Sequence, residues 1–130
     1  MAGFSDYLED KVLDHVFGGT AYTAPTTHYV ALYTVAPTDT GGGTEVSGGA
    51  YARQTSTFTV SGTSPTTATN AAAVEYPTAT ADYGTVVAVG IVDALTSGNL
   101  LAYANLDTSK PVTSGDVFRF DAGDLDITLA

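Results

Sequence analysis

The hydrophobic pattern of the first twenty residues differs from that of the rest of the chain. The apolar residues there recur at every fourth position and share one helical face: Phe4, Leu8, Val12 and Val16. Ser5 can act as the N-cap because its hydroxyl can accept a hydrogen bond from a free backbone N–H of the first turn. Gly18 and Gly19 can take the left-handed conformation that ends many helices. The pattern predicts an amphipathic helix over residues 4–18.

Beyond residue 19 the apolar residues alternate with polar ones or form short runs, which is typical of β-strands. The segment 28–34 has apolar residues on both faces, so we expect it to lie centrally in a sheet. The segment 84–93 is the most apolar, and 100–107 is its expected hairpin partner. Gly90 indicates a bulge or a close backbone approach. Further strands are expected at 51–60, 71–76, 117–121 and 125–129, and a small-polar loop at 62–70.

About seven strands with glycine-containing turns favour an all-β fold, an antiparallel β-sandwich with one N-terminal α-helix. Jelly-roll and immunoglobulin-like topologies both stay open. A chain of 130 residues is expected to form a single domain over 1–130. Residues 36–49 are too rich in glycine for a regular element, so they form a mobile loop or an arm that orders against a neighbour.

The composition excludes several classes of protein and of binding site. The chain has no cysteine, which excludes disulfides and thiolate metal sites. It contains no apolar run of the ~20 residues that a membrane helix needs, so no membrane partner is expected. Acidic residues stand where a secretory signal peptide carries basic ones.

The charge argues against nucleic acid as a partner. The formal net charge is −10, and the few basic residues are scattered: Lys11, Arg53, Lys110 and Arg119. A phosphate-binding surface needs clustered basic side chains. An acidic surface instead favours solubility and suppresses non-specific association.

Candidate chemistry is sparse. Four carboxylates near the C-terminus could suit calcium, but their spacing matches no EF-hand and turns commonly carry solvated aspartate: Asp116, Asp121, Asp124 and Asp126. His15 and His28 have no marked nucleophile, and the triple glycine 41–43 lacks the lysine of a phosphate loop. We therefore expect no catalytic residue, no metal, no cofactor and no enzyme activity.

A partner surface is the remaining candidate site. The apolar helix stripe can pack on the sheet, which is the more common arrangement, or part of it can dock on another chain. The expected partner interface comprises Phe4, Leu8, Val12, Val16, Gly41, Gly42 and Gly43.

Several segments together resemble a family of small tailed-bacteriophage virion proteins that are commonly labelled tail fibre or tail-fibre-like. They are SDYLEDKVLDHVFGGTAYTAP, YVALYTVAP, GGTEVSGGAYARQ, EYPTATADYGTVVAVGIVDA, GNLLAYANL and SGDVFRFDAGDLDITL. The resemblance covers nearly the whole chain in order. It implies a non-enzymatic virion protein that assembles with other phage structural proteins, and it supplies no catalytic or ligand residues.

The position on the particle is a separate question. A fibre shaft normally needs a repeat or a heptad array, and the sequence has neither. An acidic β-domain therefore suits a minor capsid or head decoration protein on the particle exterior, with a tail fibre or minor tail protein as the alternative. A carbohydrate-binding receptor module is the alternative of another class. We expect a homo-oligomer, with a trimer as the leading state, or ordering only on the virion, after assembly in the host cytoplasm.

Overall fold

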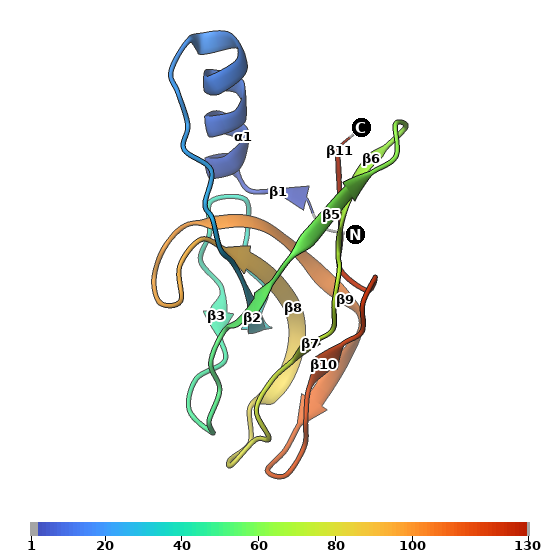
Figure 1. The fold of residues 1–130 in the computed structure, drawn as a ribbon. Coiled ribbons are helices and arrows are strands. Elements are labelled where there is room, and N and C mark those ends of the chain that lie inside the picture. The colour runs from blue at the N-terminus through green and yellow to red at the C-terminus, as the bar shows by residue number, and fades with distance from the viewer. Residues whose placement is uncertain (1–2, 130) are drawn as a thin grey trace.

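Strands make up most of the regular structure in the computed structural model, which describes residues 3–129 (Figure 1). The elements in chain order are β1 (Gly3–Phe4), α1 (Asp6–Leu13), the π-helical turn η1 (Asp14–Gly18), β2 (His28–Val35), β3 (Thr44–Glu45), β4 (Gln54–Ser56), β5 (Phe58–Ser61), β6 (Thr66–Asn70), β7 (Val74–Glu75), β8 (Gly84–Val92), β9 (Leu100–Val112), β10 (Arg119–Phe120) and β11 (Asp126–Leu129).

The largest layer is an antiparallel sheet of six strands in the order β1-β9-β8-β2-β3, with β4 also paired to β2. Its centre is the β8–β9 hairpin, in which Gly90 lies opposite Tyr103. Strand β2 lies next to β8 on one side and next to β3 and β4 on the other. The predicted central hairpin and the central place of the strand at residues 28–34 are thus confirmed.

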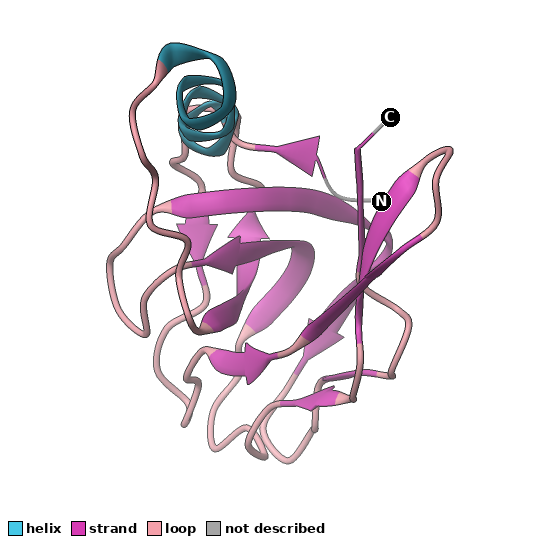
Figure 2. Cartoon of the chain, turned by 45° about the horizontal axis from the view of Figure 1, so that its top comes forward, coloured by secondary structure: helices cyan, strands magenta, loops and turns pink. Residues whose placement is uncertain are grey.

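A second layer of short strands lies across one face of this sheet (Figure 2). It consists of the β7–β10 pair and the three-stranded sheet β11-β6-β5. Buried side chains of both layers form the main core: Val30, Leu32, Val86, Val89, Ile91 and Leu101 from the large sheet, and Val74, Tyr76, Phe118, Phe120 and Leu125 from the second layer. The hydroxyl of Tyr76 donates to the carbonyl of Val30 at 2.7 Å and ties the layers together. The antiparallel β-sandwich with one N-terminal helix is confirmed.

The opposite face of the large sheet has a smaller buried cluster of Ala31, Tyr33, Ala88 and Val92. Gly90 lies on this face, and a Cβ there would stand 2.8 Å from Tyr33 Cε1 and 2.9 Å from Leu100 Cδ1. The absent side chain leaves room for both neighbours. The close approach predicted at Gly90 is confirmed.

The predicted start of the helix is wrong by two residues. Phe4 lies in β1, where its backbone pairs with that of Ala102, so it cannot join the helix. Ser5 is the N-cap, as predicted, and its Oγ accepts from the Leu8 N–H at 3.3 Å. The α-helix runs over Asp6–Leu13 and widens into η1, which ends at Gly19 with φ of 78°.

Two predictions for the segment 51–70 are also wrong. Residues 51–60 do not form one strand, because the chain leaves the large sheet after β4 and enters the second layer at β5. Residues 62–70 are not a loop throughout, since β6 pairs with both β5 and β11. Its threonines suit a strand although they carry no apolar alternation.

The other strand boundaries differ in length. Strands β7, β10 and β11 are shorter than predicted, and β9 continues through Pro111 to Val112. Pro111 is tolerated because β1 pairs with β9 at Ala102 and Tyr103, and within residues 3–129 no strand on that side needs a backbone N–H from residue 111.

The glycine-rich segment 36–49 lies against its own chain. It contains β3, and Val46 is buried in the main core with its N–H bonded to the Leu32 carbonyl at 2.9 Å. The N–H of Asp6 also donates to the Asp39 carbonyl at 2.9 Å, which brings the segment to the start of α1. Whether it also contacts a neighbouring subunit stays a prediction.

Candidate functional site

The helix is anchored to the sheet through its first turn. The backbone N–H of Ser5 donates to the Leu101 carbonyl at 2.8 Å, and its hydroxyl donates to the Leu100 carbonyl. Tyr7 and Leu8 pack partly against the main core. The rest of the helix projects from one end of the molecule (Figure 1). Of the predicted interface residues, Phe4, Leu8 and Val12 are therefore half-buried, whereas Val16 is 61% exposed.

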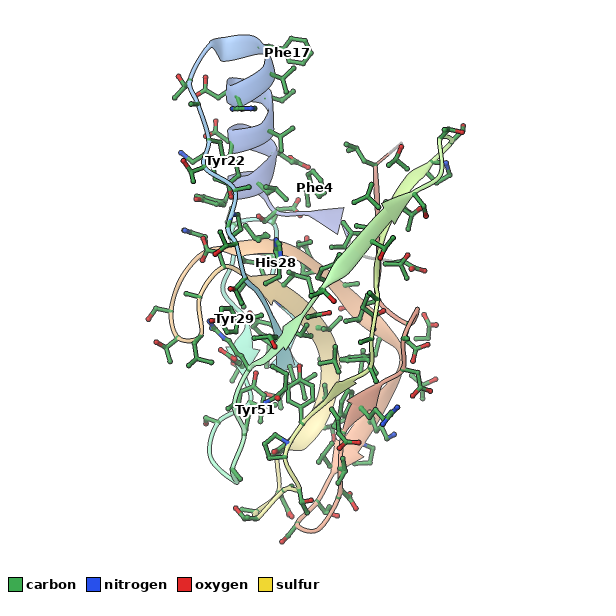
Figure 3. The ribbon with its side chains drawn as sticks, viewed as in Figure 1. Phe4, Phe17, Tyr22, His28, Tyr29 and Tyr51 are labelled. Carbon is green, nitrogen blue, oxygen red and sulfur yellow. The ribbon has the colours of Figure 1, made fainter. Side chains whose placement is uncertain are left out.

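The far end of the helix carries three large apolar side chains in water. Leu13, Val16 and Phe17 are 59%, 61% and 82% exposed, and we call them the helix tip. They follow one another at intervals of three and one residues, which places them together at the last turns. Figure 3 shows Phe17 at the outermost end, pointing away from the sheets. The helix tip is an uncovered apolar surface on an acidic protein.

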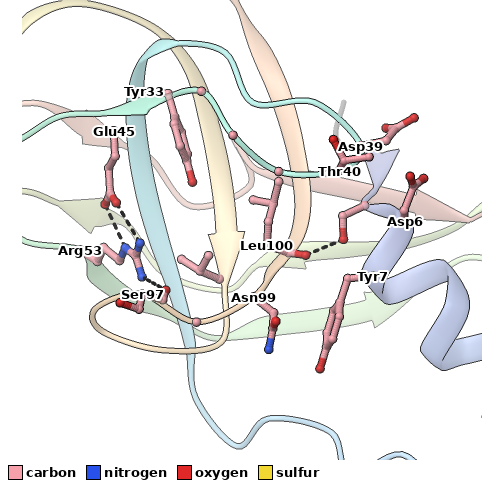
Figure 4. Close-up of a pocket in the computed structure, with 16 residues that line it drawn as sticks. Asp6, Tyr7, Tyr33, Asp39, Thr40, Glu45, Arg53, Ser97, Asn99 and Leu100 are labelled. Atoms are coloured by element: carbon pink, nitrogen blue, oxygen red, sulfur yellow. Dashed lines mark hydrogen bonds and ion pairs between the residues drawn. The ribbon is translucent and has the colours of Figure 1, made fainter.

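A cavity of about 520 Å³ lies at the other end of the helix (Figure 4). Three segments far apart in the chain surround it: the first turn of α1 at residues 5–7, the glycine segment at 39–43, and the turn at 97–99. Its remaining lining includes Tyr33, Glu45, Arg53, Val92 and Leu100. The predicted interface glycines Gly41, Gly42 and Gly43 thus lie at this cavity, and the helix tip lies at the far end of α1.

An ion pair closes one side of the cavity. Arg53 donates to Glu45 through Nε at 2.9 Å and through Nη2 at 2.8 Å, a bidentate geometry. Its Nη1 donates to the carbonyls of Ala94 at 2.8 Å and Ser97 at 2.7 Å. The Tyr51 hydroxyl donates to Glu45 Oε2 at 2.6 Å. Arg53 thereby fastens β3 and the β8–β9 turn to the start of β4.

This cluster changes the proton affinity of its members. Burial raises the pKa of Glu45, but the hydrogen bonds from Arg53 and Tyr51 outweigh it, so the pKa lies below its ordinary value. The hydrogen bonds to Glu45 raise the pKa of Arg53. The pKa of Tyr51 is raised mainly by burial and, to a smaller extent, by the hydrogen bond to Glu45. At neutral pH the cluster is a fixed carboxylate–guanidinium pair with a neutral tyrosine.

Sequence reasoning did not find the residues at this cavity other than the glycines. Glu45, Arg53 and Tyr33 are spread over three strands and loops, and no motif spacing joins them. Pairing of β2 with β3 and β4 brings them together.

The acidic residues near the C-terminus accept hydrogen bonds from protein groups, and Asp124 accepts from the backbone N–H of Asp121 at 2.9 Å. Asp116 accepts from the N–H of Thr113 at 2.9 Å, Asp121 from Arg119 at 2.8 Å, and Asp126 from Thr69 at 2.9 Å. Within residues 3–129, no group of three or more His, Cys, Asp or Glu side chains is arranged to hold a metal ion. In the same part of the chain, no helix has the length and apolar character required to cross a membrane.

The antiparallel sandwich and its projecting helix define a class of protein, a small β-domain whose distinctive surfaces are suited to contact with other molecules. The family is given by a comparison with family sequence models. The model described as Podophage GP4 fiber I protein gp80 matches residues 3–128, and the chain belongs to this family of phage fibre proteins. A search of curated proteins found no match.

Membership of this family makes the protein a bacteriophage structural protein that is associated with the virion. The resemblance to phage tail-fibre-like proteins is confirmed. The match gives no support to the place on the head, as a minor capsid or decoration protein, that the sequence analysis preferred. It agrees with the tail-fibre alternative.

Proposed function

We propose that this protein is a non-enzymatic structural subunit of a fibre on the tail of the phage particle, and that it attaches to another phage structural protein through the helix tip. The observation that carries the proposal is the match of a phage fibre family over residues 3–128. The β-domain is then the body of the subunit, and the helix is its means of attachment on the particle exterior.

The helix tip supports this role on energetic grounds. Burial of apolar surface contributes about 25 cal/mol per Å², and in a free subunit Leu13, Val16 and Phe17 contribute little of it because they are largely exposed. Large apolar side chains gathered at one exposed place mark interaction sites more often than single exposed ones do. A groove on a partner would bury the tip as other amphipathic helices are buried.

The charge of the chain indicates the chemistry of the partner. The helix carries Asp6, Glu9, Asp10 and Asp14, and the whole chain has a formal net charge of −10. Two such surfaces repel each other, whereas a basic rim attracts one. The partner is therefore expected to be a different phage structural protein with an apolar groove and basic residues at its rim.

Replacing the tip tests the proposal. In a phage that lacks the gene, a complementing Val16→Ser/Phe17→Ser variant should be lost from purified particles, since two of the three apolar contacts are removed. Its thermal midpoint should match that of the wild type because both residues are exposed. Leu95→Ser is the matched control, since Leu95 is also exposed, at 53%, but lies in the β8–β9 turn.

Normal incorporation of the double variant would contradict attachment through the tip. Analytical ultracentrifugation of the same proteins also tests the expected homo-oligomer, for which a trimer is the leading state. An oligomer that dissociates in the double variant would show that the tip binds other copies of this chain and not a different protein.

A further inference from the structure

We propose that this protein pairs with a second copy of itself through the outer edge of β5, so that the small sheets β11-β6-β5 of the two copies join into one antiparallel sheet. The proposal goes beyond the fibre role and does not depend on which protein holds the helix tip. Three features of the molecule support it: the unpaired backbone groups of β5, the protection of the neighbouring strand edges, and the distribution of charge.

The outer edge of β5 has backbone groups that no other strand uses. The N–H of Ala71 donates to the Thr57 carbonyl at 2.9 Å, so the backbone groups of Thr57 face β6. These groups alternate in direction along an antiparallel strand. Those of Thr59 therefore also face β6, whereas those of Phe58 and Val60 face away from it. Within residues 3–129, no strand pairs with β5 on that outer side.

Two other strand edges are protected where that of β5 is not. The part of β9 beyond its pairing with β1 carries Asp107, Lys110 and Pro111, and β11 carries Asp126. Charged side chains and proline keep an edge strand from pairing with another chain. Strand β5 has neither, its register with β6 is regular, and its Val60 is 67% exposed. Of these three edges, that of β5 is the most open to a further strand.

The charge distribution favours a second copy of this chain as the partner. No charged side chain lies in residues 54–74, which include β5 and β6. The whole chain has a formal net charge of −10, so two copies repel each other, and the repulsion is weakest where their uncharged hairpins meet. A basic partner would be attracted to the acidic parts of the surface and not to this edge.

The nearest charges in the joined sheet are far apart. Asp126 is the one charged residue in β5, β6 and β11, and it lies opposite Thr69, which lies opposite Thr59. In the joined sheet five strand spacings separate the two copies of Asp126, about 24 Å at about 4.8 Å each. The Debye length is about 8 Å at physiological ionic strength, so this repulsion is largely screened.

A two-fold axis next to Thr59 satisfies the unpaired groups of both copies. Phe58 of each copy then lies opposite Val60 of the other, and the two Val60 side chains lie on one face, about 8 Å apart. The β5–β6 hairpin extends beyond the large sheet, and Thr59, Val60 and Ser61 are all exposed (Figures 1 and 2). Such a pair closes at two copies, so a dimer is expected here in place of the trimer that the sequence analysis preferred.

Analytical ultracentrifugation over a concentration series measures the association. Val60→Asp should raise the dissociation constant about tenfold or more, because it places two carboxylates close together in the pair. Leu129→Asp is the matched control, since Leu129 is 58% exposed on the same face of the same small sheet but lies on the opposite edge. It should associate as the wild type does. Thermal unfolding confirms that each variant is folded.

Two further measurements identify the edge directly. Hydrogen exchange followed by NMR should show the amides of Phe58 and Val60 exchanging fast in dilute protein and slowly in concentrated protein, whereas the amide of Thr59 exchanges slowly in both. A mixture of Val60→Lys and Val60→Asp should associate more tightly than either variant alone, because opposite charges then face each other.

Four results would overturn the proposal. They are a wild-type protein that stays monomeric at the concentrations of an NMR sample, a trimer as the associated state, equal weakening by Leu129→Asp and Val60→Asp, and exchange of the Phe58 and Val60 amides that does not depend on concentration. The Val16→Ser/Phe17→Ser variant should dimerise as the wild type does. Loss of the dimer in that variant would place the contact between copies at the helix tip and not at β5.

Discussion

Gly90 illustrates how one missing side chain organises the less covered face of the large sheet. Tyr33 and Leu100 occupy the space above it, and a Cβ would stand 2.8 Å and 2.9 Å from their side-chain carbons. Its φ angle is not in the left-handed region, so the requirement for glycine comes from packing and not from backbone strain. The same ring of Tyr33 forms part of the cavity.

Gly90→Ala should lower the free energy of unfolding by about 1–3 kcal/mol, because the added methyl group overpacks a filled space. Urea denaturation followed by circular dichroism measures the change. Gly3→Ala is the control, since a Cβ there meets nothing within 4 Å. Equal stability of Gly90→Ala and wild type would show that Tyr33 does not lie over this residue.

Glu45 sets a pH dependence of stability. Its pKa in the folded protein is below its ordinary value of 4.5, so its contribution is present above that value and is lost as the pH falls through the folded pKa. Glu45→Gln should cost about 1–3 kcal/mol near neutral pH, because Arg53, whose side chain is only 9% exposed, loses its charged partner. The difference from wild type should shrink as the pH falls below 4.5.

Urea denaturation at a series of pH values tests this prediction. The matched control is Glu75→Gln, which breaks the exposed Arg119–Glu75 pair, with side chains 50% and 58% exposed. It should change stability by less than about 0.5 kcal/mol at any pH. A stability difference for Glu45→Gln that stays constant down to acid pH would contradict the assigned pKa direction.

The residues that sequence reasoning found are those whose roles are local. The Ser5 cap, the helix end at Gly19 and the close approach at Gly90 follow from neighbouring residues or from the absence of a side chain. Phe118 and Phe120 lie two residues apart in the strand expected at 117–121, and both are buried, with ring centroids 5.0 Å apart. Tyr33, Glu45, Arg53 and Asn99 meet only through sheet pairing, so their common site could not be read from the chain.

At the scale of elements, the errors arise where the chain changes layer or register. Residues 51–60 were expected to form one strand, but the chain crosses there from β4 in one layer to β5 in the other. In β8, a register shift between Val86 and Ala88 places Val87 and Ala88 on the same face. Val86 then lies in the main core, fully buried, whereas Val87 is half-buried on the opposite face. A strict two-residue alternation cannot foresee such a shift.

The helix shows the same limit. Its periodicity, its N-cap and its C-terminal end could be predicted from the sequence. The pattern does not distinguish the part of the apolar stripe that packs on the sheet from the part that is exposed. Tyr7 and Leu8 pack against the core, and Leu13, Val16 and Phe17 stand in water. The difference depends on the anchoring of Ser5 to Leu100 and Leu101, which fixes only the first turn.

At the scale of the whole molecule, the family and the projecting helix together support the proposed function. The family match assigns the chain to phage fibre proteins. In the proposed role, the helix that projects from one end of the molecule attaches such a subunit to its partner (Figure 1). Absence of a shaft repeat argued for the head, but a fibre can include subunits that do not form the shaft.

The place of the protein on the particle is the most direct test of the central claim. Intact virions should be labelled with gold-conjugated antibodies against this protein and imaged by electron microscopy, with particles that lack the gene as the control. We predict gold particles along or at the base of the tail fibres and none on the head. Label confined to the head, or absent from intact particles, would contradict the account.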